Sequence, residues 1–409
     1  MASRDRRPGS RMTSGERRAT ACLAGVSGLR MLGLFIVLPV LALYAAALPG
    51  GEDPARIGLA LGAYGLAQAL LQVPFGWASD HVGRKPAIAA GLVVFAAGSF
   101  LAAWAPDVAS LIAGRALQGA GAVSAAAMAL AADLTRDEVR TRTMAAIGIT
   151  IGATFAVSLV AGPPLAGAIG VPGIFVLTGV LAACAIGVVA FGVPAPPARV
   201  AHATGDRAAA RRAIVDPQLL RLDFGIFALH AILMALFVEL PFALRDAGLD
   251  ATRHWVVYLP VMLVTVAIVL PLFRVADRPG RGKAMLTAAI AVLAVAMLVL
   301  AGAQRSLAVI VGGLLLFFSA FTLLEASLPA MVSRFAPRAA RGAAIGVFSA
   351  MQYLGMFAGA AAGGWLVKHM GPASVYGFGA AVAVVWLVAS ATMANPPATA
   401  EASFSMGRT

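Results

Sequence analysis

Residues 74–86 read PFGWASDHVGRKP and separate two long apolar stretches in a chain of 409 residues. The segment places an acid, two bases and a glycine within a few positions of one another. The pattern returns in residues 271–281, which read PLFRVADRPGR, and its proline, aspartate, glycine and arginine keep a constant offset of 197 residues. A charged loop that recurs half a chain later, between apolar stretches, predicts a duplicated membrane bundle.

The composition favours a membrane protein over a soluble one. Hydrophobic residues make up 60% of the chain and charged residues 12%, with a mean hydropathy of +0.88, whereas soluble domains carry about 25% charged residues. The net charge of +13 is scattered over short loops, so we expect no nucleic-acid partner. The two cysteines lack metal-ligand spacing and no phosphate-binding loop occurs, so we expect no metal, no cofactor and no ATP-driven step.

Apolar runs long enough to cross a bilayer predict twelve transmembrane helices. Their expected ranges are 20–45, 56–79, 86–104, 108–132, 143–168, 172–193, 220–244, 254–274, 283–303, 306–331, 342–367 and 373–394. We predict an all-α membrane protein with two six-helix bundles, 20–193 and 220–394, joined by a linker, 194–219. Residues 1–19 and 395–409 are expected to be disordered. Pairs of small residues predict close helix packing at Gly58–Gly62, Gly148–Gly152 and Gly359–Gly363.

Lysine and arginine predict the orientation of the chain in the membrane. Of the 31 basic residues, 24 fall on the side that holds both termini, the linker and both charged loops, and five fall on the other side. Both termini are therefore expected in the cytoplasm. We expect a multi-pass monomer in the lipid bilayer of the cytoplasmic, or inner, membrane.

The charged loop resembles the signature of the major facilitator superfamily between its second and third helices. The residues that carry this resemblance are Gly76, Asp80, Gly83, Arg84 and Lys85, with a degenerate second copy at Asp277 and Arg281. Arg115 and Gln118 in the fourth span resemble the Arg-x-x-Gln-Gly element of the same superfamily. Residues 29–35, 254–259 and 323–329 resemble the YajR-like transporters, and this likeness runs along nearly the whole chain.

The resemblance implies two six-helix bundles, alternating access and proton-driven export of hydrophobic, drug-like small molecules. YajR-like transporters can carry an extra soluble domain after the last helix. Only about 15 residues follow the last predicted span, so we do not expect that domain here.

Ionisable residues deep in a span are costly and are candidates for function. They fall on spans 1, 4, 7 and 10, which line the central cavity in the superfamily fold. We predict a proton-coupling or cavity role for Arg30, Arg115, Gln118, His230, Glu239 and Glu325. The alternative for each is a structural role, such as packing against backbone carbonyls or solvation near a span end.

Glu325 is the first candidate for the proton carrier, because it is an acid on a cavity-lining helix with no base nearby on that helix. His230 is the second, because an imidazole titrates near neutral pH. Arg30 does not deprotonate, although it can influence a neighbouring acid. His230 and Glu239 are nine residues apart and therefore lie on opposite faces of one helix.

Aromatic and methionine side chains predict a soft wall for hydrophobic cargo. The expected wall consists of Phe317, Phe318, Phe321, Met351, Tyr353 and Met356. For any single one of them the alternative is a position facing lipid or the protein core.

The loop at residues 74–86 is expected to act as a conformational latch rather than as a substrate site. Gly83 is expected to supply a tight turn, and Asp80 to lie near the amino end of span 11, around Gly342. Arg84 is expected to bridge Asp80 and Asp133. The full latch comprises Gly76, Asp80, Gly83, Arg84, Lys85, Asp133, Asp277 and Arg281. The alternative is a solvated loop that only sets topology.

Other functions remain open at this point. A facilitator or a proton symporter that imports a small solute fits the same spans, and the direction of flux distinguishes it from an exporter. A membrane-embedded lipid-modifying enzyme requires clustered acids at one interface, whereas Asp80, Asp133 and Asp277 lie in separate loops beside bases. A non-transporting scaffold does not account for charges on all four cavity helices.

Overall fold

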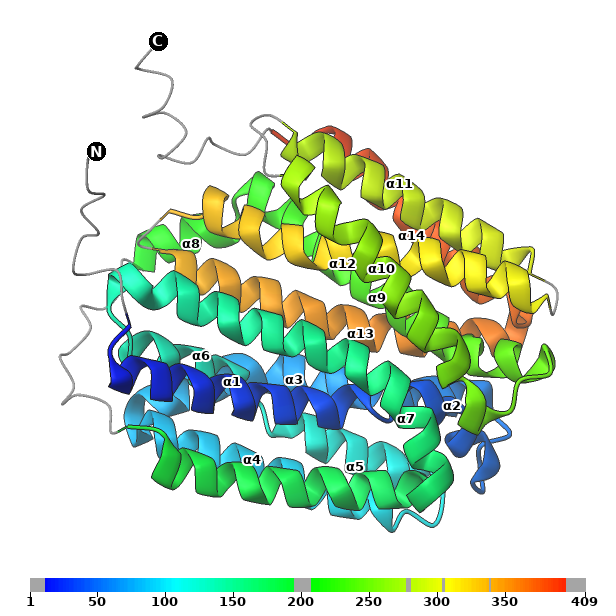
Figure 1. Ribbon diagram of the computed structural model, residues 1–409, viewed down its shortest axis with the longest axis horizontal. Helices are drawn as coiled ribbons and strands as arrows, with labels where there is room; N and C mark the ends of the chain where they lie inside the picture. Colours follow the sequence, from blue (N-terminus) through cyan, green and yellow to red (C-terminus); the bar gives the residue numbers. More distant parts are fainter. Residues whose placement is uncertain (1–11, 195–206, 277–280, 304–305, 338–339, 395–409) are drawn as a thin grey trace, which may run out of the picture.

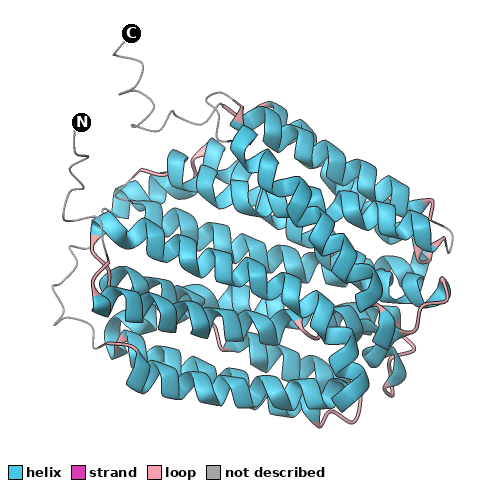
Figure 2. Cartoon of the chain, viewed as in Figure 1, coloured by secondary structure: helices cyan, strands magenta, loops and turns pink. Residues whose placement is uncertain are grey.

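The computed structural model describes residues 12–194, 207–276, 281–303, 306–337 and 340–394. Within these ranges the chain is almost entirely helical and contains no strand (Figure 2). The helices of the first half are α1 (Ser14–Phe35), α2 (Leu38–Ala47), α3 (Pro54–Val82), α4 (Arg84–Ala103), α5 (Val108–Ala120), α6 (Ser124–Asp133), α7 (Asp137–Gly187) and the π-helix η2 (Val188–Gly192). Those that follow are α8 (Arg207–Ile214), α9 (Pro217–Asp246), the short η3 (Ala251–Arg253), α10 (Trp255–Ala276), α11 (Gly282–Ala301), α12 (Leu307–Phe335), α13 (Arg341–Met370) and α14 (Ala373–Ala391).

Ten helical segments of the described chain are long and apolar enough to cross a membrane. The fourth predicted span is not among these ten, because it is broken at residues 121–123 into two shorter helices, α5 and α6. The expectation of one continuous helix over 108–132 is therefore wrong. Conversely, α7 holds two spans, because the chain leaves helical geometry at Gly170 (φ 72°, ψ 165°) and reverses direction (Figure 1). With both differences counted, the twelve predicted spans are present.

The first helix begins earlier than the sequence predicted. A capping box at its start explains this, because Thr13 accepts a hydrogen bond from the Glu16 amide and Glu16 accepts one from the Thr13 amide. Two orphan backbone donors are satisfied in this way. Residues 14–19 are therefore helical, whereas the sequence assigned them to a disordered segment.

The long helix α13 is central to the arrangement, and it packs against both α3 and α9 (Figure 1). A β-carbon on Gly359 would lie 2.0 Å from the carbonyl oxygen of Ala231 in α9, and one on Gly58 would lie 2.3 Å from that of Ala360. Only glycine permits such an approach of two backbones. By contrast, a β-carbon on Gly148 would meet no heavy atom within 4 Å, so that predicted pair does not mediate helix packing.

The two halves of the chain are packed tightly at one end. There the start of α3 meets the end of α13, and a β-carbon on Gly364 would lie 2.5 Å from the carbonyl oxygen of Pro54. At the opposite end of α13, β-carbons on Gly342 and Gly346 would meet nothing within 4 Å. The structure therefore packs the halves closely at one end of α13, whereas the glycine face near the other end of α13 contacts no described neighbour.

Two lysines show the internal duplication in atomic contacts. Lys85, at the start of α4, donates to the carbonyl oxygen of Val193, 108 residues later. Lys283, at the start of α11, donates to the carbonyl oxygen of Ala391 at 2.9 Å, again 108 residues later. In each half, the third span is thus tied to the end of the sixth span at the end of the bundle that carries the charged loop.

Candidate functional site: two polar clusters inside the helix bundle

The first polar cluster surrounds Arg30, which lies on α1 with only 4% of its surface exposed. Its guanidinium donates to the hydroxyl oxygen of Tyr64 at 2.8 Å and also to Gln68 Oε1 and Ser124 Oγ. The Nε atom of Arg30 is buried and has no acceptor among the described residues. The break between α5 and α6 places Ser124 at the first position of α6, within reach of this guanidinium.

Arg115 extends the same cluster from α5. Its Nη1 atom donates to Gln118 Oε1 at 2.5 Å, and its guanidinium carbon lies 5.2 Å from the centre of the Tyr64 ring. Tyr64 therefore contacts both arginines, one through its hydroxyl group and the other through its ring. In the described part of the chain, neither arginine forms an ion pair with a carboxylate.

The second polar cluster joins α9, α12 and α13. His230 Nε2 lies 3.7 Å from Glu325 Oε2, and the side-chain amide of Gln352 lies between the two residues. Gln352 Nε2 is 2.8 Å from His230 Nε2 and 3.2 Å from Glu325 Oε1. The structure thus brings together the two residues that the sequence ranked first and second as proton carriers.

The hydrogen bonds around His230 fit a neutral imidazole. Its Nδ1 atom lies 3.2 Å from the carbonyl oxygen of Ile226 and donates to it, so Nε2 is free to accept from the Gln352 amide. The second N–H of that amide is available for Glu325. Glu325 Oε2 is buried and has no hydrogen-bond partner in the described residues, although the side chain as a whole is 38% exposed.

An aromatic row connects the two halves of the chain beside this second cluster. Phe155 of α7 stacks on Phe321 with ring centres 5.6 Å apart, and Phe321 contacts the His230 ring at 5.8 Å. Phe35 of α1 packs edge-on against Phe155 at 4.8 Å. The two polar clusters also meet through α13, because the hydroxyl oxygen of Tyr353 lies 3.5 Å from Ser124 Oγ.

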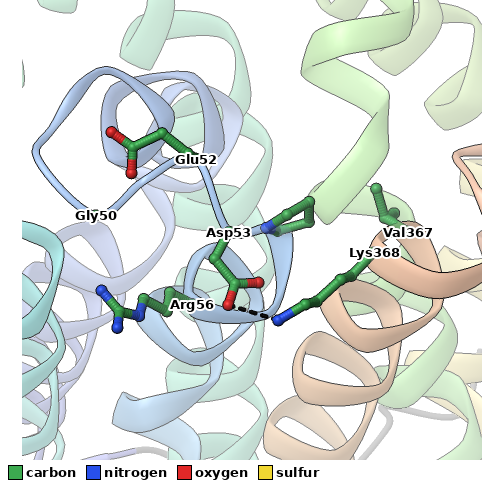
Figure 3. Close-up of a pocket in the computed structure, with 7 residues that line it drawn as sticks. Gly50, Glu52, Asp53, Arg56, Val367 and Lys368 are labelled. Carbon is green, nitrogen blue, oxygen red and sulfur yellow. Dashed lines mark hydrogen bonds and ion pairs between the residues drawn. The ribbon is translucent and has the colours of Figure 1, made fainter.

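An ion pair joins the halves at their closed end. Lys368 Nζ, on α13, lies 2.8 Å from Asp53 Oδ2, at the N-cap of α3 (Figure 3). The Lys368 ammonium, and then the backbone N–H of Ala55, hold the pKa of the Asp53 carboxyl below its usual range. Glu52 and Arg56 line the same shallow pocket.

The charged loop forms a local ion-pair network. Arg84 lies 2.6 Å from Asp80 Oδ1 and 3.2 Å from Asp133 Oδ2, which confirms the predicted bridge. Gly83 adopts a φ of 103°, so the predicted turn glycine is also confirmed. The predicted contact of Asp80 with the start of α13 is not formed, since its side chain is 54% exposed and the space around Gly342 is open. The packing of the halves at the opposite end explains the difference.

The sequence model of the family described as Major Facilitator Superfamily matches residues 23–324 and 254–407. The chain belongs to this superfamily. The inner membrane transport protein YajR of Escherichia coli strain K12 is 43% identical to this chain over 389 residues. The match covers 95% of this chain and 86% of YajR.

Two more distant proteins complete the comparison. The class G tetracycline resistance protein of Vibrio anguillarum is 29% identical over 235 residues, or 57% of either chain. The solved structure of the xylose transporter XylE of Escherichia coli, in a partially occluded inward-open conformation, has a TM-score of 0.74 at 13% identity and covers 95% of this chain and 100% of its own. That identity shows a shared fold alone.

The chain is therefore a secondary transporter of the superfamily rather than an enzyme. This finding removes the lipid-modifying enzyme from the alternatives. The apolar helices fit a multi-pass membrane protein, and a transporter of this superfamily is expected to bind a small-molecule substrate.

The remaining predicted site residues of the transporter are dispersed. Glu239 is 7% exposed, and its carboxylate forms no hydrogen bond or ion pair within the described ranges. Phe317 and Phe318 are completely buried, and Met351 is half-buried next to Gln352. The β-carbon of Met356 lies 3.1 Å from the position of a β-carbon on Gly65, so Met356 belongs to the packing between α3 and α13.

The outer members of the predicted latch contribute little to the observed network. A β-carbon on Gly76 would meet only that of Ala125, at 3.5 Å, which is an ordinary contact. Lys85 binds the Val193 carbonyl rather than an acid. Arg281 is exposed at the start of α11, and Asp277 lies outside the described residues.

Sequence reasoning missed the neutral polar residues that complete both clusters. Gln68 and Gln72 are buried and bond to each other at 3.0 Å, while Tyr64, Ser124 and Gln352 contact the ionisable residues directly. The signal was present, because amide side chains inside apolar spans are as conspicuous as charges. Gln118 was predicted only through its place in the Arg-x-x-Gln-Gly element, and the other amide residues belong to no such motif.

Proposed function

We propose that the transporter is a proton-coupled exporter of small hydrophobic molecules that works by alternating access in the inner membrane. The similarity to YajR, whose name describes an inner membrane transport protein, supports this location. The similarity to tetracycline resistance proteins supports export. The excess of lysine and arginine on one side supports cytoplasmic termini.

The observation that carries the proposal is the contact between His230, Gln352 and Glu325. A proton carrier must load on one side of the membrane and release on the other, which requires titratable groups in the bundle interior. His230 Nε2 and Glu325 Oε2 are 3.7 Å apart, so a single proton can be held by the carboxylate or by the imidazole. The buried Oε2 atom has no hydrogen-bond partner among the described residues, and a proton on the carboxylate removes the cost of an unpaired negative charge at this place.

The aromatic row supplies a surface for a hydrophobic cargo. Phe155 and Phe321 belong to different halves and stack at 5.6 Å, so their separation accompanies any movement of the halves at this level. Phe321 also contacts His230 at 5.8 Å. Cargo that enters between the two rings therefore lies beside the proposed proton site.

The alternation between states follows from the two ends of the interface. Asp53 and Lys368 form an ion pair across the halves at one end, and the Asp80–Arg84–Asp133 network belongs to the charged loop at the other end. In our proposal the network becomes a latch when the second end closes, because Asp80 then meets the free N–H groups at the start of α13.

The test uses purified protein in proteoliposomes that contain a pH-sensitive dye, with a panel of lipophilic cations, anions and neutral drugs. A cargo of the wild-type protein is expected to drive proton flux opposite to its own movement. Glu325→Gln is expected to abolish accumulation against a gradient while downhill exchange continues, and Glu239→Gln, an acid outside the cluster, is expected to do less.

Two results would count against this assignment. Proton movement in the same direction as the cargo would identify a symporter. Accumulation and pH changes that are unaltered in Glu325→Gln would make Glu325 a structural residue and leave His230 as the leading carrier.

A further inference from the structure

The buried arginines of the first polar cluster have no counter-charge within the described part of the chain. Arg30 is 4% exposed and Arg115 is 2% exposed, and no described carboxylate pairs with either of them. Tyr64, Gln68 and Ser124 accept hydrogen bonds from Arg30, but these oxygens are neutral. An isolated charge inside a membrane bundle is costly and such residues ordinarily find a partner of opposite sign.

The unused donors of the two arginines suit an anion. Arg30 Nε and Arg115 Nε are both buried, and neither has an acceptor among the residues that the structure describes. The Nε and Nη atoms of a guanidinium form the edge that binds carboxylate, sulfonate or phosphate oxygens in pairs. The hydroxyl groups of Tyr64 and Ser124 can rotate and donate to the same anion.

The position of the cluster also suits a cargo with a hydrophobic body. Ser124 lies 3.5 Å from the hydroxyl oxygen of Tyr353 on α13, and the next residue towards the N-terminus, Gln352, belongs to the second cluster. Phe321 contacts the His230 ring of that cluster at 5.8 Å, and Phe155 stacks on Phe321. A single amphiphilic molecule can therefore meet a cationic wall on the first half of the chain and an aromatic wall between the halves.

We propose that the cargo carries a negatively charged group, such as a carboxylate or a sulfonate, on an aromatic or aliphatic body, and that Arg30 binds this group. Arg115 supports the site as a second positive charge beyond the Tyr64 ring. The inference depends on the proposed function in one respect, namely that the molecule bound at Arg30 is the cargo that is transported. Binding itself requires neither a proton gradient nor a particular direction of transport.

The experiment measures binding to the purified full-length protein in neutral detergent, without a gradient. Three probes share a naphthalene body and differ in the attached group: naphthalenesulfonate, naphthalenesulfonamide and naphthyltrimethylammonium. The sulfonate remains charged at all working pH values, so its charge does not change with the buffer. We expect the sulfonate to bind at least about tenfold more tightly than the other two probes. This is the gain in affinity that a hydrogen bond to a charged group ordinarily provides.

Variants identify the residue responsible. Arg30→Gln is expected to remove the preference for the sulfonate. Arg30→Lys is expected to keep part of this preference, because lysine retains the positive charge but lacks the paired N–H donors of the guanidinium. Arg253→Gln, which removes an exposed arginine after α9, is the matched control and is expected to keep the full preference. Gel filtration and thermal unfolding verify that each variant is folded.

Three outcomes would overturn the inference: equal affinity for the three probes, no binding of the sulfonate, or a preference that survives in folded Arg30→Gln. None of them bears on the proposed proton-coupled export. A neutral or cationic cargo that drives opposing proton flux in proteoliposomes would leave that function intact while the anion site fails.

Discussion

Lys368 and Asp53 form a salt bridge of 2.8 Å between the two halves of the chain. Lys368 belongs to the end of α13 and Asp53 to the N-cap of α3. The pair lies where the two helices approach through Gly58 and Gly364. Both side chains are partly exposed, so the contribution of the pair to the closed state is expected to be modest.

The first prediction concerns this closed end. Asp53→Asn removes the charge but keeps the size of the side chain, and we expect a measurable increase in the open population. Spin labels at the Asp53 end of α3 and the Lys368 end of α13, with distances measured by electron spin resonance, report that population. Lys368→Met removes the other charge and leaves the cap of Asp53 on the Ala55 N–H intact. It should open this end as much as Asp53→Asn, and the double variant should open it no further. Additive effects of the two changes would mean that the charges do not act as a pair.

The same pair predicts a pH dependence. The pKa of Asp53 lies below its usual range in the closed state and returns towards that range, near pH 4, when Lys368 moves away. The ion pair therefore stabilises the closed end fully above roughly pH 4. This stabilisation is lost as the pH falls through the lower pKa that Asp53 has in the closed state. Label distances at this end should not change between pH 5 and 8 on account of Asp53; a change that Asp53→Asn abolishes would contradict this.

Gln352 offers a prediction about coupling. Its amide contacts His230 Nε2 at 2.8 Å and Glu325 Oε1 at 3.2 Å, so Gln352→Leu removes both hydrogen bonds and leaves a similar volume. We expect proton-driven accumulation to fall by about tenfold, as for the loss of a hydrogen bond to a charged group. Cargo binding in detergent should change less. Met351→Leu, one residue away, is the control, and an equal loss in both variants would point to helix packing instead.

The charged loop leads to a prediction about turnover. Asp80→Asn keeps the side-chain volume and weakens the contact with Arg84, which is 2.6 Å long in the structure. If the loop is a latch, transport turnover should fall while membrane insertion and cargo affinity remain intact, because a latch shifts an equilibrium between states. Glu52→Gln, an exposed acid at the other end, serves as the control. Unchanged turnover in Asp80→Asn would leave the loop with a topological role only.

Helix packing gives a prediction about stability. Alanine at Gly359 places a β-carbon 2.0 Å from the Ala231 carbonyl oxygen, and α9 and α13 must move apart to accept it. Overpacking of this kind costs about 1–3 kcal/mol, which thermal unfolding in detergent can detect. Gly148→Ala, where no heavy atom lies within 4 Å, should leave the melting temperature unchanged or raise it. Because alanine favours a helix over glycine, a similar loss in both variants would mean that the contact with Ala231 does not cause the effect.

The twelve spans were predictable because a bilayer imposes a minimum apolar length on every crossing. The interruptions inside these spans were less visible. Residues 121–123 break the fourth span, yet they are glycine, alanine and valine and carry no turn signature. The break matters for the site, since it sets the position of Ser124 beside Arg30.

The candidate site was predictable in its charges but not in its pairings. The cost of burial singled out Arg30, Arg115, His230 and Glu325, and the structure sorts them into two clusters. Nothing in the spacing indicated that His230 and Glu325, 95 positions apart in the sequence, would lie within 3.7 Å. Such contacts depend on how separate helices rotate about their axes, which a single sequence does not specify.

The bonds from Lys85 to Val193 and from Lys283 to Ala391 bear on how the polypeptide can be divided. Each bond closes its own half through residues that belong to that half alone. The covalent connection between the halves therefore takes no part in this closure. A gene cut within the segment that encodes residues 195–206 would produce two fragments, each able to tie its third span to its sixth before the two meet in the membrane.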